Sequence, residues 1–446
     1  MISLKTVSGL VVFSLGMLAR TTEASACGGC FVPPEENSQV TGHRMIMSIG
    51  ATQSTLYDQI EYSGAPESFA WVLPTKGIVE IGVSSDVLFN QLGQDSQVTV
   101  AAPPLNCPYN YCNDGSFAEG SPSDGSTASG SGGGVTVIAE KVVGPYETVQ
   151  LKAEDPAALQ TWLADHGYAL PKDIEPLVKS YVQEGFNFLA VKLVPGAGVK
   201  AMQPIRITSK GSNVTLPLRM VAAGTGALTT ISLYVVSEFR AEASNFPRFV
   251  VDPKKVLWDY DNNRSNYTEL RAEGYKASSG FGWLTESSQA YSSFGLRGQL
   301  ENILNSLGAS ASGYGKDDND ADAAQAALLT DMDTLFAGMD PNGVWLTRIR
   351  AELPRDALSQ DLKLQASSEQ TAVDRYIQTT EFIGAQPTCA PVPVDCEYPQ
   401  GDAVIVVNGG SGCSVGTSRF TDAVFGGVFG LAGLATVLRR RRVAKR

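Results

Sequence analysis

Alternating hydrophobic and polar positions open the body of this chain. Three such runs, at residues 43–49, 56–62 and 69–74, are separated by short stretches of Thr, Gln, Ser, Gly and Pro. A period of two residues, broken by turn-forming residues, is typical of half-buried β-strands joined by hairpins. We therefore predict an antiparallel meander at the start of the body, with one face of each strand turned toward a core.

A polar interruption separates these strands from two predicted helices. Residues 113–134 are rich in Gly, Ser, Asp and Pro and have almost no apolar content, which predicts a flexible insertion, and strand signals resume at 135–139. Asp155-Pro156 is a favourable helix start, and residues 175–184 form a second helix that Gly185 ends. Further strands are predicted at 186–194, 205–207, 215–220 and 232–239.

Beyond residue 250 the pattern becomes more helical. Residues 266–270 predict a short helix, and the compositions of 324–339 and 344–353 are helical too. We predict an α+β fold with an antiparallel β-rich body, an inserted helix pair, a more helical C-terminal region and a single C-terminal transmembrane helix. The predicted segments are a signal peptide (1–26), a β-rich α+β domain (27–250), a mixed, mostly helical region (251–385), a Pro/Gly/Cys stalk (386–412) and a sorting or transmembrane tail (413–446).

The N-terminal residues have the order of a secretory signal peptide. Lys5 precedes an apolar run at 7–18, and Ala24-Ser25-Ala26 follows, which is the charged, apolar and small-residue order of such peptides. Cleavage after Ala26 makes Cys27 the first mature residue. Lipidation of Cys27 is the alternative, although Ala24 stands where that route prefers a leucine-like residue. An uncleaved anchor helix is disfavoured because the apolar run is short.

The C-terminal residues predict membrane anchoring. Residues 423–438 carry no charge, and the next four residues are Arg439, Arg440, Arg441 and Arg442. A helix of this length covers roughly 24 Å at ~1.5 Å per residue, less than a hydrocarbon core of roughly 30 Å, but arginine side chains snorkel toward the headgroups. Because arginine-rich segments stay in the cytoplasm, we expect the body to lie outside the inner membrane.

This tail resembles the short C-terminal sorting signals of the myxobacterial type, in which a Gly-Cys or Cys-Ser signature precedes one helix and an arginine cluster. Cys413 matches the signature cysteine. The resemblance implies that a membrane protease removes the helix and that Cys413 becomes the attachment point. The expected partners are then the membrane and the export and tail-processing machinery. A permanent single-pass anchor is the alternative.

The seven cysteines divide into three close pairs and one single residue. In an oxidising compartment this spacing favours three local disulfides, although six cysteines allow 15 connectivities. The single residue is the cysteine that the tail resemblance also selects. The candidate disulfide pairs are Cys27 with Cys30, Cys107 with Cys112, and Cys389 with Cys396, which leaves Cys413.

Charge argues against one class of partner. The whole chain has a formal net charge of −12. The body is more acidic still, because the tail from Cys413 onward is rich in arginine and its positive charge is counted in that total. An exported body of this charge repels phosphate backbones, so we expect no nucleic acid partner. Divalent cations and basic surfaces are more compatible with it.

Cys27-Gly28-Gly29-Cys30 has the spacing of a redox motif. A catalytic Cys-x-x-Cys usually opens a helix whose N-terminus lowers the pKa of the thiol, whereas here Phe31-Val32-Pro33-Pro34 follows and resists helix formation. A structural disulfide is therefore favoured over thiol exchange. The chain has two histidines, His43 and His166, and no Gly-x-Ser-x-Gly elbow accompanies them. No catalytic residue is assigned.

Acidic residues at 318–322 occupy alternate positions, as they do in calcium-binding loops. Ala323 and Leu329 stand where such a loop needs a glycine and a glutamate, and residues 259–263 begin the same pattern without completing it. A solvated acidic loop is favoured, and weak calcium binding is the alternative. No metal site is assigned, and no cofactor is implied.

Several short motifs resemble those of a known family. They are CGGCF at 27–31, FAWVLP at 69–74, VGPYE at 143–147, WL through GY at 162–168, QPIRI at 203–207, LPLR at 216–219 and LTRIR at 346–350. As a set they resemble the bacterial domain-of-unknown-function 2330 family, whose members are exported and have no established activity. The resemblance implies export and one continuous fold over most of the mature chain, and it carries no mechanism.

The expected function is non-enzymatic. We predict an exported protein that its tail holds at the cell envelope, with a structural or interaction role and with a protein or glycan ligand that the sequence does not identify. The alternatives are a periplasmic thiol-disulfide enzyme that uses Cys27 and Cys30, and a calcium-dependent surface adhesin.

Overall fold

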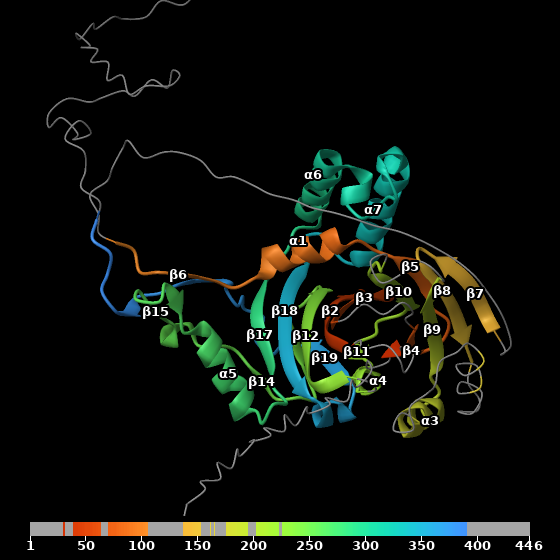
Figure 1. Cartoon of the computed structure of the whole chain (residues 1–446), viewed down its shortest axis with the longest axis horizontal. Helices are drawn as coiled ribbons and strands as arrows, with labels where there is room; N and C mark the ends of the chain where they lie inside the picture. Colours follow the sequence, from red (N-terminus) through yellow and green to blue (C-terminus); the bar gives the residue numbers. More distant parts are fainter. Residues whose placement is uncertain are drawn as a thin grey trace, which may run out of the picture. The chain divides into compact units, whose positions relative to one another are not determined.

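A computed structural model gives the fold of the body (Figure 1). It describes residues 30–31, 39–63, 70–105, 137–152, 161, 165, 175–194, 202–222 and 225–389. The predicted signal peptide, the 113–134 insertion, most of the stalk and the whole tail lie outside these residues, as does nearly all of the first predicted helix. Individual residues outside them are Ala26, Cys27, Cys107, Cys112, His166, Cys396, Cys413 and Arg439 to Arg442.

An eight-stranded sheet forms the centre of the described body, in the order β14-β17-β18-β12-β2-β3-β10-β5. Two of its pairings, β12 with β2 and β14 with β17, are parallel, and the other pairings are antiparallel. The strands are β14 (Arg248–Phe249), β17 (Trp283–Ala290), β18 (Trp345–Pro354), β12 (Thr225–Ser237), β2 (Gln39–Ile49), β3 (Gln53–Ser63), β10 (Ile205–Lys210) and β5 (Glu80–Val83).

The parallel pair at the middle of this sheet corrects the prediction of an antiparallel body. Parallel neighbours need a long crossover connection, and the chain between β2 and β12 supplies one by building a second sheet. The predicted meander is also corrected, because β2 and β3 form the expected hairpin while β4 (Ala70–Thr75) leaves for that second sheet.

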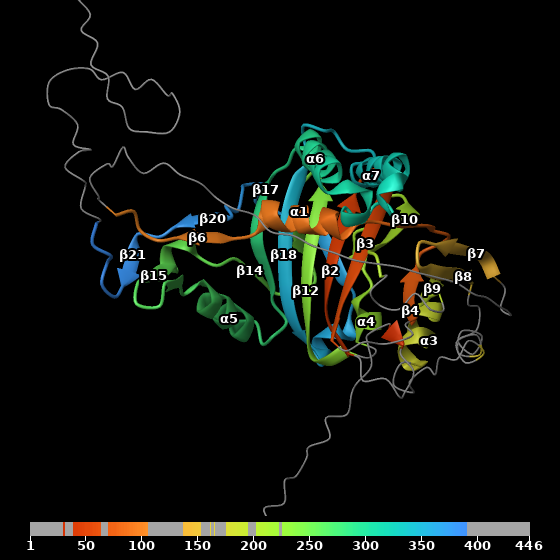
Figure 2. The ribbon, with the colours of Figure 1, turned by 45° about the horizontal axis from the view of Figure 1, so that its top comes forward.

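The second sheet has five antiparallel strands in the order β1-β4-β9-β8-β7. Besides β4 it contains β1 (Cys30–Phe31), β9 (Asn187–Leu193), β8 (Tyr146–Leu151) and β7 (Val137–Val143). Its strands lie to one side of the central sheet in both views (Figures 1 and 2). Short helices and strands outside the two large sheets are α3 (Glu175–Gln183), α4 (Leu218–Val221), η4 (Arg355–Ser359), β11 (Thr215–Leu216), β19 (Leu362–Ala366) and β13 (Ala241–Ala243).

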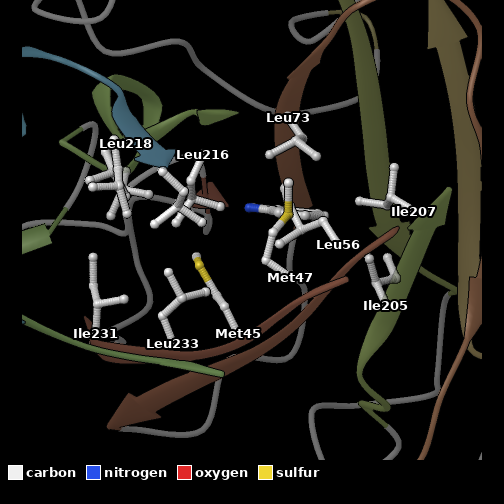
Figure 3. Packing of buried hydrophobic residues seen from close by; sticks show 14 of the residues in the cluster. Met45, Met47, Leu56, Leu73, Ile205, Ile207, Leu216, Leu218, Ile231 and Leu233 are labelled. Carbon is white, nitrogen blue, oxygen red and sulfur yellow. The ribbon is translucent and has the colours of Figure 1, made fainter. Parts of the chain in front are cut away.

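The main core lies between the two sheets. Met45 and Met47 of β2 belong to it, whereas Ile46 between them faces the other side of the sheet, as the period of two residues requires. Figure 3 shows Leu73 of β4 across the cluster from Met45 and Met47, with Ile205 of β10 beside them. Residues 43–49 form a strand as predicted, but both faces of that strand are buried and not one.

Three helices cover the opposite face of the central sheet. They are α1 (Asp86–Ser96), α6 (Ser293–Ala311) and α7 (Ala321–Leu335), and both views place them on the same side (Figures 1 and 2). Ser85 caps α1 by accepting a hydrogen bond from the Val87 amide at 3.1 Å. Helix α7 confirms the helical prediction for 324–339, whereas α1 and α6 were not predicted from the sequence.

A third group of elements lies around α5 (Tyr267–Ala277), which extends the short helix predicted at 266–270. Its own small core includes Val251, Val256 and Tyr275. The remaining elements of the described body are β15 (Leu257–Asp259), β16 (Arg264–Ser265), β21 (Glu381–Ile383), β20 (Tyr376–Gln378), β6 (Thr99–Ala101), η2 (Pro253–Lys255) and η3 (Asp318–Asp320).

Two sequence predictions fail in the middle of the fold. Residues 344–353 form strand β18 and not a helix, because their hydrophobic residues alternate with Arg348 and Arg350 at a period of two. The strand predicted at 215–220 divides at Pro217 into β11 and α4, because proline lacks an amide donor for a ladder.

The central sheet also runs across the domain boundary predicted at residue 250. Strands β17 and β18 follow that boundary in the sequence and lie beside β12, which precedes it. Within the described residues, no helix combines the length and the apolar character that a membrane crossing demands. The span predicted at 423–438 lies outside the described residues.

Candidate functional site

Cys30 lies in a strand. It pairs with Trp71 across β1 and β4. Cys389, at the other end of the described body, is disulfide-bonded. Its predicted partner Cys396 lies outside the described residues, and the predicted pairing therefore stays a prediction.

His43 is buried in β2 against a carboxylate of the neighbouring strand. Its Nδ1 atom lies 3.0 and 3.1 Å from the two carboxylate oxygens of Asp58, and the two side chains are 0% and 2% exposed. Asp58 also lines a cavity between the sheets with Trp71 and Met220. That cavity has a volume of about 10 Å³, room for about one water, so an organic substrate does not reach the His43–Asp58 pair through it.

The acidic positions of the calcium-like pattern face their own loop. Asp318 accepts a hydrogen bond from the Ser310 amide at 3.4 Å, and Asp320 accepts one from the Lys316 amide at 2.8 Å. These bonds use the carboxylates to hold the loop between α6 and α7. Across the described part of the chain, no three His, Cys, Asp or Glu side chains gather as a metal site requires.

A tightly bonded arginine cluster lies where α3, α4 and the start of β19 meet, and both terminal nitrogens of Arg219 donate in it. Arg219 donates to both carboxylate oxygens of Glu184, at 2.6 and 2.8 Å, and to Asp361 at 2.8 Å. It also donates to the Ser180 hydroxyl at 3.0 Å, and its guanidinium lies 4.0 Å from the centre of the Tyr181 ring. Tyr181 in turn donates to Asp361 at 2.6 Å. We name these five residues the α4 cluster.

The bonds from Arg219 lower the pKa of the Glu184 carboxyl below its ordinary value. Glu184 is 45% exposed, whereas Asp361 is 8% exposed, so the buried partner depends more on Arg219. The arrangement is that of a structural crosslink, since each carboxylate already has a guanidinium donor.

A second buried arginine, Arg206 of β10, forms an ion pair with Asp331 of α7. Asp331 is fully buried and also accepts a hydrogen bond from the Ser84 hydroxyl at 2.5 Å. Burial raises the pKa of Asp331 to about 6, against the opposing effects of Arg206 and Ser84. This pair holds α7 onto the central sheet, because the two residues come from those two elements.

The third group of charges is the candidate site, and we name it the α5–β18 ion cluster. Strand β18 supplies alternate residues from one face, and α5 supplies residues four apart, which share one face of a helix. Strand β17 adds a glutamate. The members are Arg348, Arg350 and Glu352 of β18, Tyr267, Arg271 and Tyr275 of α5, and Glu286 of β17.

A β-bulge gives Glu286 its position. The register of β17 against β18 shifts between Thr285 and Ser287, so Glu286 has no partner residue of its own on β18. Bulges redirect side chains and are frequent near functional sites. Here Glu286 meets Arg348, whose Nε atom lies 2.6 Å from Glu286 Oε2 at an angle that does not make a hydrogen bond.

The outer half of this cluster is held loosely. Arg271 lies 3.5 Å from Glu352 and 4.0 Å from Glu286, and Arg350 lies 3.6 Å from Glu352. Arg271, Arg350 and Glu352 are 22%, 23% and 27% exposed, whereas Glu286 is 5% exposed. A solute can therefore reach the outer residues, while the inner pair of Arg348 and Glu286 is enclosed.

Two tyrosine hydroxyls complete the electrostatics. Burial raises the pKa of Tyr275, Glu352 and Glu286 raise it further, and Arg350 and Arg271 oppose them. Burial also raises the pKa of Tyr267. Both hydroxyls therefore keep their protons at neutral pH and act as donors. The cluster thus offers hydrogen-bond donors and positive charge, which are groups that can bind an anion.

Sequence reasoning found this cluster only in part. Arg348 and Arg350 belong to the LTRIR motif, but the segment was assigned to a helix. The i, i+4, i+8 spacing of Tyr267, Arg271 and Tyr275 was a readable signal. Glu286 is positioned by a β-bulge, and no sequence signal predicts that bulge.

The comparisons with known proteins agree with the motifs. A family model described as "Uncharacterized protein conserved in bacteria (DUF2330)" matches residues 21–361, a range that includes β18 and every described strand of the two large sheets. Neither the curated proteins nor the solved structures gave a match to the chain.

Proposed function

The chain belongs to the DUF2330 family of uncharacterised bacterial proteins, and from that premise we propose that it is a non-enzymatic, exported protein with a structural or interaction role at the cell envelope. The observation that carries the proposal is the pairing of two signals in one chain. A signal-peptide order occupies residues 1–26, and a cysteine, an apolar stretch and an arginine block occupy 413–446.

The chemistry of the described body supports the non-enzymatic role. Cys30 lies in a strand, and His43 faces a buried carboxylate beside a cavity of water size. The disulfide at Cys389 is compatible with an oxidising compartment. The α5–β18 ion cluster, whose outer residues are partly exposed, offers binding groups, which supports an interaction role.

Mapping the mature ends of the protein tests export and anchoring together. We expect the protein in the membrane fraction of the native bacterium, with Cys27 as its first residue and without residues 423–438. The Cys413→Ser variant is expected to be exported normally and to keep its tail. Intact protein with reduced thiols in the cytosol would overturn the proposal, and an identical full-length tail in both proteins would show a permanent anchor.

Thiol titration of the exported protein separates this proposal from the redox alternative. We expect no free thiol at Cys27 or Cys30, because a structural disulfide would hold both. Two free N-terminal thiols with a pKa well below the ordinary ~8.5 would instead support thiol exchange.

Calcium titration separates the proposal from the adhesin alternative. We expect no rise in melting temperature on adding calcium, since Asp318 and Asp320 already accept backbone hydrogen bonds. A rise that disappears in the Asp318→Asn, Asp320→Asn, Asp322→Asn variant would support calcium binding.

A further inference from the structure

We propose that the α5–β18 ion cluster is a binding site for an oxyanion, a phosphate or carboxylate group, held between Arg271 and Arg350 with the Tyr275 hydroxyl as a third donor. This inference rests on the proposed interaction role and names the chemistry of the ligand. It concerns the purified protein only, so its test does not depend on where the protein is located in the cell.

Unused donors are the first argument. Arg271 and Arg350 approach the cluster's carboxylates no closer than 3.5 Å, whereas charge-assisted hydrogen bonds measure about 2.7–2.9 Å. The buried Nε atom of Arg350 has no hydrogen-bond partner among the described residues. Guanidinium groups present a planar fork of N–H donors that matches phosphate and carboxylate oxygens. The guanidinium groups of Arg271 and Arg350 are partly exposed and make no short hydrogen bond to the carboxylates of the cluster.

Tyr275 is the second, independent argument. The residue is 6% exposed, and its hydroxyl is buried without a hydrogen-bond partner among the described residues. A buried hydroxyl without a partner is unfavourable, and native proteins keep such groups where a ligand or function uses them. Tyr275 follows Arg271 by four residues on α5, so the two side chains share one face of the helix, and the charges of Glu352 and Arg350 both influence the pKa of the Tyr275 hydroxyl.

Charge balance is the third argument. The cluster holds three arginines and two glutamates, so it keeps one positive charge in a chain whose formal net charge is −12. Glu286 is enclosed beside Arg348, while Glu352 sits between Arg271 and Arg350 and is the most exposed of the charged members. Glu352 therefore occupies part of the space that an incoming oxyanion needs, and its carboxylate competes with that anion.

Calorimetric titration of the full-length protein in mild detergent tests the site. The probes are inorganic phosphate and acetate, with chloride at matched ionic strength as the reference, so that the two arms distinguish a phosphate from a carboxylate ligand. We expect saturable binding of one of these probes and none of chloride. Absence of saturable binding of either probe would overturn the proposal.

Three variants then locate the binding. Arg350→Gln and Tyr275→Phe should each weaken binding about tenfold, or about 1.4 kcal/mol, because each removes a hydrogen bond to a charged ligand. Glu352→Gln should tighten binding, because it removes the competing charge. A purely structural ion network predicts the opposite for Glu352→Gln, since losing that carboxylate would loosen the cluster without creating affinity.

A matched control keeps the result interpretable. Arg297 of α6 is an exposed arginine paired with Glu301 at 2.8 Å, and Arg297→Gln should leave the affinity unchanged. Tyr275→Phe removes only an unpartnered hydroxyl, so it remains informative if Arg350→Gln fails to fold. Equal affinities in the Tyr275→Phe, Glu352→Gln and Arg297→Gln proteins would place the anion elsewhere and overturn the proposal.

Discussion

The α4 cluster and the α5–β18 ion cluster both combine arginine, carboxylates and tyrosine. They differ in how closely the guanidinium groups approach the carboxylates. The Arg219 guanidinium makes four hydrogen bonds of 2.6–3.0 Å to two carboxylates and a hydroxyl. Arg271 and Arg350 approach their carboxylates only at 3.5–4.0 Å. The tyrosines differ in the same way, because Tyr181 donates to Asp361, whereas the Tyr275 hydroxyl has no hydrogen-bond partner within the described part of the chain.

This difference separates a structural role from a binding role. In the α4 cluster a ligand would have to break existing bonds and leave Asp361 buried without its partner, which is costly. In the α5–β18 ion cluster a ligand could accept hydrogen bonds from Arg271, Arg350 and the Tyr275 hydroxyl without breaking a short bond within the protein. The distance between the terminal guanidinium nitrogens and the carboxylates, more than the number of charged residues, therefore distinguishes the two clusters.

Removing the central arginine should produce the largest contrast. We expect Arg219→Met to lower the free energy of unfolding by about 3–5 kcal/mol, because it leaves the buried Asp361 carboxylate uncompensated. Arg271→Met in the other cluster should cost only about 0–1 kcal/mol, as expected for a loose and partly exposed ion pair. Urea unfolding of both variants measures this, and equal losses would remove the distinction between the clusters.

The pH dependence of stability should sharpen the comparison with the fully buried ion pair. The pKa of Asp331 is about 6 in the folded protein and 3.8 when unperturbed. The protonated form is therefore favoured by folding, so the contribution of this group is present below pH 4 and is lost as pH rises through about 6. Glu184 has a lowered pKa and gives the opposite slope.

We expect the free energy of unfolding of the native protein, relative to the Asp331→Asn variant, to fall by about 3 kcal/mol between pH 3 and pH 8, as a shift from 3.8 to about 6 implies. Urea unfolding across this range gives both curves. Parallel curves would mean that Asp331 does not titrate in this window.

A pair of tyrosine variants should give the smallest and most selective effect. Tyr181→Phe removes a 2.6 Å hydrogen bond to Asp361 and should cost about 2 kcal/mol. Tyr275→Phe removes a hydroxyl that has no partner in the described structure, and it should change the free energy of unfolding by less than about 0.5 kcal/mol. Thermal and urea unfolding compare the two, and a large loss for Tyr275→Phe would reveal a partner for that hydroxyl.

Much of the strand pattern could be predicted from the sequence. The alternation at 43–49 and 56–62 corresponds to β2 and β3, and the segments predicted at 186–194 and 232–239 correspond to β9 and β12. These strands lie inside the sheets, where side chains on successive residues must face opposite layers. The α+β class and the membership of the family followed from the same segments and motifs.

What failed depends on partners that lie far away in the sequence. The composition of residues 344–353 suggested a helix. In the structure they form β18, whose partly buried Arg348 and Arg350 are balanced by acidic residues, among them Glu286 of β17. The bulge at Glu286 and the parallel pairing of β2 with β12 are set by neighbours and not by local propensity. By contrast, Ser85 and the apolar residues Leu88 and Leu92 were a local helix signal for α1 that could have been read.

The pairing of β2 with β12 has a consequence for how the chain folds. The second strand of the protein finds its partner at residues 225–237, and that partner in turn needs β18, near residue 350. Contacts of such long sequence separation fold slowly, on a scale of about milliseconds to seconds. During synthesis the β2–β3 hairpin keeps the edge of β2 unpaired until β12 has been made. An unpaired strand edge favours aggregation, so the incomplete chain depends on protection during this time.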